Sequence, residues 1–127
     1  MSYELEFTVD VLPKSQTNNY GSHWARIKAI KEWRERVWVS THGRRPEEPL
    51  KKATVHFIRR SSAPPDYTNL VASFKPVEDA LVKCGIILDD NPKVIGYPTY
   101  AWEYAAPKKG GIIVRVKGVT TLVEMDT

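Results

Sequence analysis

Hydrophobic and polar residues alternate strictly near the start of the chain. From Tyr3 to Val11 every second residue is apolar, and Glu, Thr and Asp fill the positions between. Alternation with a period of two is typical of a strand that buries one face. Pro13 ends this pattern, because proline has no N–H group for a strand ladder, and a polar loop is predicted over residues 14–21.

Two later segments have the apolar spacing of helices. The first begins after Ser22, which can cap a helix, and continues to about Thr41. The second runs from about Leu70 to Cys84. Pro76 is compatible with a helix only near its first turns, so we expect a kink or a later start there. The residues that recur at steps of three or four are Ile27, Ile30, Trp33, Val37 and Trp38 in the first segment, and Leu70, Phe74, Val77, Leu81 and Cys84 in the second.

Three further segments are predicted to be strands, over residues 53–60, 94–104 and 112–119. The sequence Pro-Lys-Lys-Gly-Gly at 107–111 is typical of the tip of a hairpin between the last two. The predicted order is β-α-β-α-β-β, without repeats or an internal linker. It indicates one α+β domain over residues 1–127, with a mixed four-stranded sheet packed with two helices.

Composition and charge narrow the class of protein. A chain of 127 residues with 42% hydrophobic and 27% charged residues can form one folded core. No apolar run is long enough to cross a bilayer, the N-terminus lacks a secretory pattern, and Cys84 has no partner for an internal disulfide. We therefore expect a cytoplasmic protein without a membrane partner. The net charge of +4 and the pI of about 9.2 are compatible with a nucleic-acid partner but do not require one.

Acidic residues around the second predicted helix could bind a metal ion. Asp66 follows two prolines at its start, and Asp89 and Asp90 follow the apolar run after its end. Carboxylates that converge repel one another, and Mg²⁺, which prefers oxygen ligands, relieves that repulsion. Lys75 could then hold a scissile phosphate. Spacing alone favours a structural role instead, in which Asp66 caps the helix and residues 89–91 form a solvated turn.

These residues resemble the signature of the RusA-like Holliday-junction endonucleases. Three separated segments agree with that signature in the right order, and the resemblance covers most of the chain. They are Asp66-x-x-Asn69-Leu70, Lys75-Pro76-x-x-Asp79-Ala80-Leu81, and Gly85-Ile86-Ile87-Leu88-Asp89-Asp90. A fourth stretch, Leu12-Pro13-x-Ser15-x-x-Asn18, resembles the loop that follows the first strand of the family.

The resemblance implies an endodeoxyribonuclease that resolves four-way DNA junctions by paired phosphodiester hydrolysis. It implies Asp66 and Asp90 as metal ligands, with Asp89 beside them, and Lys75 as the catalytic or phosphate-binding lysine. Mg²⁺ is the implied cofactor, with Mn²⁺ as a substitute. A homodimer is also implied, since two symmetry-related strands must be cut.

Several polar and basic residues are predicted to contact the DNA. Arg59 and Arg60 end the second strand shortly before Asp66, and Lys108 and Lys109 lie at the predicted hairpin tip. Their charges suit the phosphate backbone. Asn69, from the first segment of the signature, is a further predicted DNA contact.

Two departures from the family pattern leave alternatives open. Thr68 stands where the family has a second aspartate, and it cannot supply a carboxylate. Lys75 lies six residues after Asn69, three more than in the compact form of the motif, which is nearly one helical turn. The chain could therefore be a protein that binds junctions or other branched DNA and whose cleavage is weak or lost. A third interpretation is a basic structural or interaction protein without DNA activity.

Overall fold

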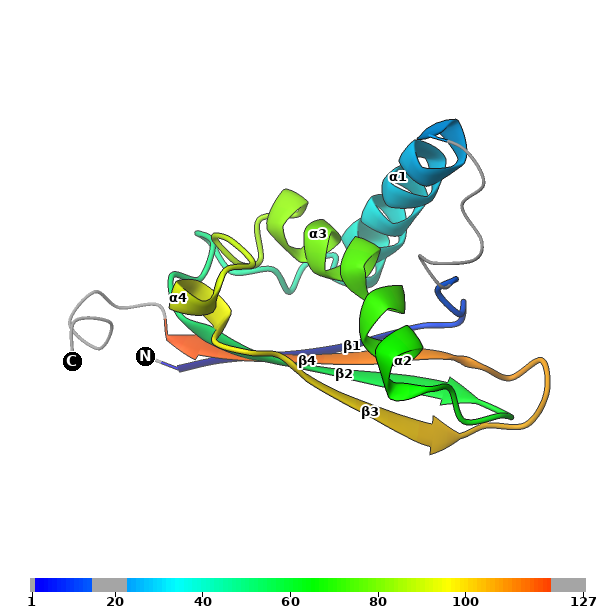
Figure 1. Ribbon diagram of the computed structural model, residues 1–127. Helices are drawn as coiled ribbons and strands as arrows, with labels where there is room; N and C mark the ends of the chain where they lie inside the picture. Colours follow the sequence, from blue (N-terminus) through cyan, green and yellow to red (C-terminus); the bar gives the residue numbers. More distant parts are fainter. Residues whose placement is uncertain (1, 15–22, 120–127) are drawn as a thin grey trace.

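The computed structural model describes residues 2–14 and 23–119 as one mixed sheet with helices on one of its faces (Figure 1). The strands are β1 (Ser2–Val9), β2 (Ala53–Ser61), β3 (Thr99–Tyr104) and β4 (Gly111–Val119). The helices are α1 (His23–Ser40), α2 (Tyr67–Ser73), α3 (Lys75–Lys83) and the short α4 (Pro92–Ile95). The α+β class and the four-stranded mixed sheet predicted from the sequence are confirmed. The predicted cap Ser22 and most of the predicted loop at 14–21 lie outside the described residues.

The strand order is β1-β4-β2-β3, which differs from the prediction in one important way. β4 pairs antiparallel with both β1 and β2, whereas β3 pairs parallel with β2. The predicted hairpin between the last two strands is therefore wrong, because β2 lies between them. Proline and glycine at 107–111 mark a change of direction, but they do not determine which strands pair. The central place of β4 suits its side chains, since Ile112, Val114 and Val116 are almost completely buried.

The predicted second helix is two helices that meet at Phe74. Pro76 lies in the first turn of α3, where a helix has no use for the missing N–H group, so the expected break at this proline is confirmed. The predicted strand at 94–104 is wrong in its first half. Residues 92–95 form α4 instead, because the Asn91 side chain accepts hydrogen bonds from the backbone N–H groups of Lys93 and Val94.

The core lies between the sheet and the helices, which Figure 1 shows as two layers. Three aromatic rings fix the start of α3 over the sheet: Phe57 of β2 lies 4.9 Å from Phe74 and 5.4 Å from Tyr100 of β3, between ring centroids. On α1 only Trp33 and Val37 are buried. The predicted apolar stripe of this helix is thus correct only in its middle, and Figure 1 shows that α1 extends beyond the sheet.

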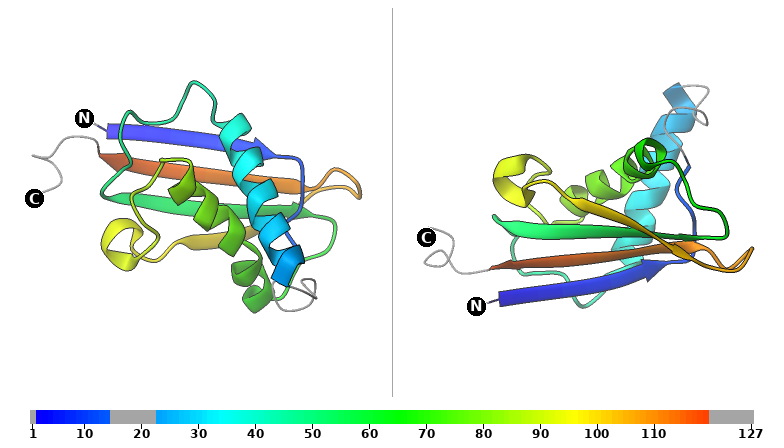
Figure 2. Two further views of the ribbon diagram at one scale, coloured as in Figure 1. Left: turned by 90° about the horizontal axis from the view of Figure 1, so that it is seen from above. Right: turned by 60° about the horizontal axis from the view of Figure 1, so that its bottom comes forward.

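Charged side chains cover the other face of the sheet. Glu6 pairs with Arg115 at 2.6 Å, Glu4 with Lys117 at 3.7 Å, and Arg60 with Glu103 at 3.4 Å, each across neighbouring strands. This face lies away from the helices (Figure 2). Within residues 2–14 and 23–119, no helix combines the length and the apolar character needed to cross a membrane.

Candidate functional site

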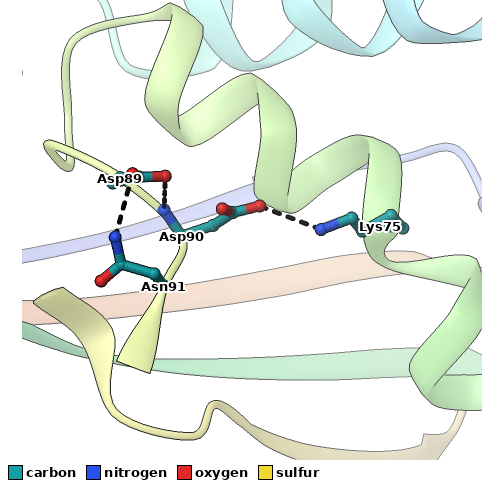
Figure 3. A network of polar contacts seen from close by, with 4 residues as sticks. All are labelled: Lys75, Asp89, Asp90 and Asn91. Atoms are coloured by element: carbon teal, nitrogen blue, oxygen red, sulfur yellow. Dashed lines mark hydrogen bonds and ion pairs between the residues drawn. The ribbon is translucent and has the colours of Figure 1, made fainter. Parts of the chain in front are cut away.

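An ion pair between Lys75 and Asp90 forms the centre of the candidate site (Figure 3). Lys75 is the first residue of α3, and Asp90 lies in the segment that joins α3 to α4. The Lys75 Nζ atom lies 3.0 Å from Asp90 Oδ2, and the two side chains remain 62% and 29% exposed. A ligand or substrate can therefore reach both groups. The lysine and the late aspartate of the family signature are side by side in the folded chain.

Backbone pairing holds the chain that leads to Asp90. Leu50 forms an isolated parallel bridge with Ile87. The Leu50 N–H donates to the Ile86 carbonyl, and the Leu88 N–H donates to the Leu50 carbonyl. Ile86 and Ile87 are completely buried. The apolar run before the aspartates thus anchors them beside α3.

Each partner of the ion pair keeps the other charged. The hydrogen bond from Lys75 lowers the pKa of the Asp90 carboxyl below its usual value. The same hydrogen bond raises the pKa of Lys75, against the opposite effect of partial burial. Both groups are therefore ionised at neutral pH, which gives the site one carboxylate and one ammonium group in direct contact.

Asp89 holds the turn that presents Asp90. One of its carboxylate oxygens accepts the backbone N–H of Asp90 at 2.7 Å, and the other accepts the Asn91 side-chain amide at 3.0 Å. Figure 3 shows Asp89 turned toward Asn91, whereas Asp90 points to Lys75. Of the two predicted aspartate ligands here, Asp90 is the one aimed at the lysine.

Asp66 and its neighbours occupy the start of α2. Asp66 is exposed in the N-cap position, with φ −61° and ψ 147°, but its side chain makes no capping hydrogen bond. Thr68 is exposed as well, and Asn69 is half-buried. In the described part of the chain, no three carboxylate, imidazole or thiol groups lie together as a ready-made metal site. Lys75 and Asp90 are thus in contact, and no hydrogen bond or ion pair among the described residues joins the Asp66 side chain to either of them.

Two residues near these parts were not predicted from the sequence. Glu78 of α3 is only 8% exposed. Burial raises the pKa of its carboxyl, Lys75 has the opposite effect on this pKa, and Asp90 raises it. The pKa of the Tyr100 phenol is raised to about 12, mainly by burial and in addition by the nearby Glu78 and Tyr67 side chains. Tyr100 therefore lies within electrostatic reach of Glu78, beside the lysine, and of Tyr67, at the start of α2. The sequence feature that could have identified Glu78 is its spacing from Lys75. Glu78 follows Lys75 by three residues, which places both on one side of a helix.

The predicted DNA-binding arginines have partners in the protein. The Arg59 guanidinium donates to the Pro13 carbonyl at 3.2 Å, and burial lowers its pKa. Arg60 is the next residue along the strand, so it points to the opposite face of the sheet and pairs with Glu103. Lys108 and Lys109 are exposed in the connection between β3 and β4, at the far end of the sheet from α4 (Figure 1).

A basic surface that includes none of the predicted DNA contacts lies beside α4. Lys52, Lys93 and Lys117 line a hollow of about 400 Å³ between α4, the start of β2 and the end of β4, and Lys117 also pairs with Glu4. We call this the lysine hollow. Lys93 follows Asp90 by three residues, so the hollow begins close to the Lys75–Asp90 pair along the chain.

Comparison with known proteins gives no independent assignment. No protein-family model matches the chain, and no curated protein sequence matches it either.

Proposed function

We propose that the protein is a divalent-metal-dependent endodeoxyribonuclease that resolves four-way DNA junctions in the bacterial or phage-infected cytoplasm. The observation that carries this proposal is the 3.0 Å contact between Lys75 and Asp90. These residues come from two separate segments of the RusA-like signature. If the two segments form one functional site, their residues are expected to be in contact. A chance resemblance of short motifs would not predict such a contact.

The donor chemistry of the site fits a magnesium ion. Mg²⁺ is usually bound through one or two carboxylates, and waters and substrate phosphates complete its coordination. Asp90 offers an ionised and accessible carboxylate, and Asp66 is an uncapped carboxylate at the start of α2. When bound, such an ion activates water and stabilises the leaving oxygen in phosphodiester hydrolysis. Mn²⁺ would serve as a substitute.

Lys75 has the properties of a phosphate-binding group in this reaction. Its raised pKa keeps the ammonium protonated, and its side chain is 62% exposed beside Asp90. A phosphate oxygen placed next to Asp90 would accept a charge-assisted hydrogen bond from Nζ. The lysine would then orient the scissile group and stabilise charge that develops on it.

Resolution also requires two cuts, for which we propose a two-fold homodimer with one site in each copy. α1 offers apolar surface outside the core of one copy. Trp24, Ile27 and Val39 of this helix are 77%, 43% and 72% exposed. Exposed apolar side chains of this size mark protein–protein contacts where they form a contiguous patch.

A labelled four-way junction, incubated with and without Mg²⁺ beside a linear duplex of equal length, tests this function. We expect paired, symmetric nicks in the junction that depend on the metal. A shifted but uncut junction would favour the second candidate, a branched-DNA-binding protein without cleavage. Thr68, and the lack of a ready-made trio of ligands among the described residues, are the observations that favour that candidate.

The lysine hollow predicts where part of the DNA backbone binds. We expect the triple change Lys52→Gln, Lys93→Gln and Lys117→Gln to weaken junction binding at every sequence. The slope of log affinity against log salt should fall by about one for each phosphate that the variant no longer neutralises. Gel-shift titrations at several salt concentrations measure this slope. The matched control is Lys31→Gln with Lys83→Gln, at two exposed lysines that the proposal does not use, and an unchanged slope in the triple variant would contradict the assignment.

A further inference from the structure

We propose, on the basis of the proposed function, that Glu78 supplies the carboxylate that Thr68 cannot, and that Glu78 and Asp90 together bind the divalent cation. Glu78 belongs to none of the positions that the RusA-like resemblance identifies. The inference concerns which side chain completes the metal site in this chain.

The burial of Glu78 is the first argument. Glu78 is only 8% exposed, and a carboxylate with so little exposure loses much of its hydration unless a partner replaces it. Lys75 makes its ion pair with Asp90, and no ion pair to Glu78 is formed by the described residues. A buried carboxylate that lacks an ion-pair partner among those residues, next to an accessible ion pair, is typical of a functional site.

The position of Glu78 is the second argument. It follows Lys75 by three residues on α3, and its carboxyl responds to the charges of both Lys75 and Asp90. Its neighbours Val77 and Leu81 are completely buried. The helix around Glu78 is therefore firmly packed, and a site on a rigid element holds its ligands in a defined geometry.

The charge balance is the third argument. Lys75 is one positive charge; it contacts Asp90, and Glu78 lies within electrostatic reach of it. Asp79 adds a third negative charge that acts on Lys75. Excess negative charge around a single lysine favours a bound cation, and two carboxylates are the number that Mg²⁺ commonly uses. Thr68, by contrast, is an exposed hydroxyl on α2.

Binding of Mn²⁺ to the DNA-free protein, measured by electron paramagnetic resonance, tests this inference without relying on catalysis. We expect Glu78→Gln to weaken Mn²⁺ binding by more than about 10-fold, because losing even a group that only supports a ligand costs about 10- to 100-fold. The matched control is Glu47→Gln, the same chemical change at an exposed residue, which should bind as the wild type does. Asp79→Asn tests the rival carboxylate on the same helix.

Thermal unfolding separates a binding defect from a folding defect. Glu78→Gln removes a buried charge and should therefore unfold at the same temperature as the wild type or higher. Glu78→Asp keeps the charge but withdraws it by one methylene, and we expect an intermediate Mn²⁺ affinity. Wild-type affinity in Glu78→Gln, a larger loss in Asp79→Asn, or no Mn²⁺ binding by the wild-type protein would each overturn the inference.

The same variants distinguish this inference from the proposed function. If the wild-type protein cuts a four-way junction and Glu78→Gln cuts it equally at every Mg²⁺ concentration, the nuclease proposal stands and the role of Glu78 fails. If Mn²⁺ binding depends on Glu78 but the wild-type protein neither binds nor cuts a junction, the metal site stands and the nuclease proposal fails.

Discussion

Asp90→Asn is expected to reduce the rate of junction cleavage by on the order of 1000-fold, while junction binding stays the same or becomes tighter. The carboxylate of Asp90 is ionised because Lys75 donates to it. Asparagine has nearly the same shape but is neutral and a weaker ligand for a hard cation. It also removes a negative charge that would face the phosphates. Single-turnover cleavage and gel shifts at one Mg²⁺ concentration measure the two effects separately.

Asp89→Asn is the control for this substitution. Asp89 uses its carboxylate oxygens within the turn, where they accept the Asp90 N–H and the Asn91 amide. The same chemical change one residue away should therefore cost less cleavage and act through the order of the turn. Cleavage by Asp90→Asn at the wild-type rate would show that the site is wrongly assigned.

The second large effect is expected at Lys75. Lys75→Met keeps most of the length and apolar character of the side chain but removes the ammonium group. We expect cleavage to fall by about 100- to 1000-fold, the usual cost of losing one group that stabilises transition-state charge. Single-turnover rates with junction in the presence of saturating Mg²⁺ measure this loss.

Lys83→Met is the matched change at the other end of the same helix. Lys83 is exposed in the last turn of α3, and no part of the proposed mechanism uses it. Its cleavage rate should remain near that of the wild type. Equal losses in the two variants would mean that general positive charge, and not the position of Lys75, supports the reaction.

Much of the fold follows from local pattern. The alternation in β1 and the apolar steps around Phe74 and Leu81 identify elements because burial on one face imposes a period on the sequence. The pairing of β3 with β2 is not local, and the turn residues at 107–111 do not encode it. α4 escaped prediction because one side chain, Asn91, caps a helix of only four residues within an apolar run.

The site was predictable to a similar extent. The signature identified Lys75 and Asp90, and the fold brings them into contact. It could not identify Glu78, because a charged residue in a helix is ordinarily exposed and only the packing of α3 buries it. The distance between Asp66 and Asp90 in the folded chain could not be predicted from their spacing in the sequence either. It depends on the direction of α2 relative to α3, which the break at Phe74 sets.

Cleavage of a supercoiled plasmid that extrudes a cruciform distinguishes paired cuts from single ones and so tests junction resolution itself. With Mg²⁺, we expect the wild-type protein to convert the plasmid to linear DNA with both cuts at the cruciform, and Asp90→Asn to leave it supercoiled. The proposed function is wrong if the plasmid stays supercoiled with the wild-type protein at every Mg²⁺ and Mn²⁺ concentration, or if Asp90→Asn linearises it equally well.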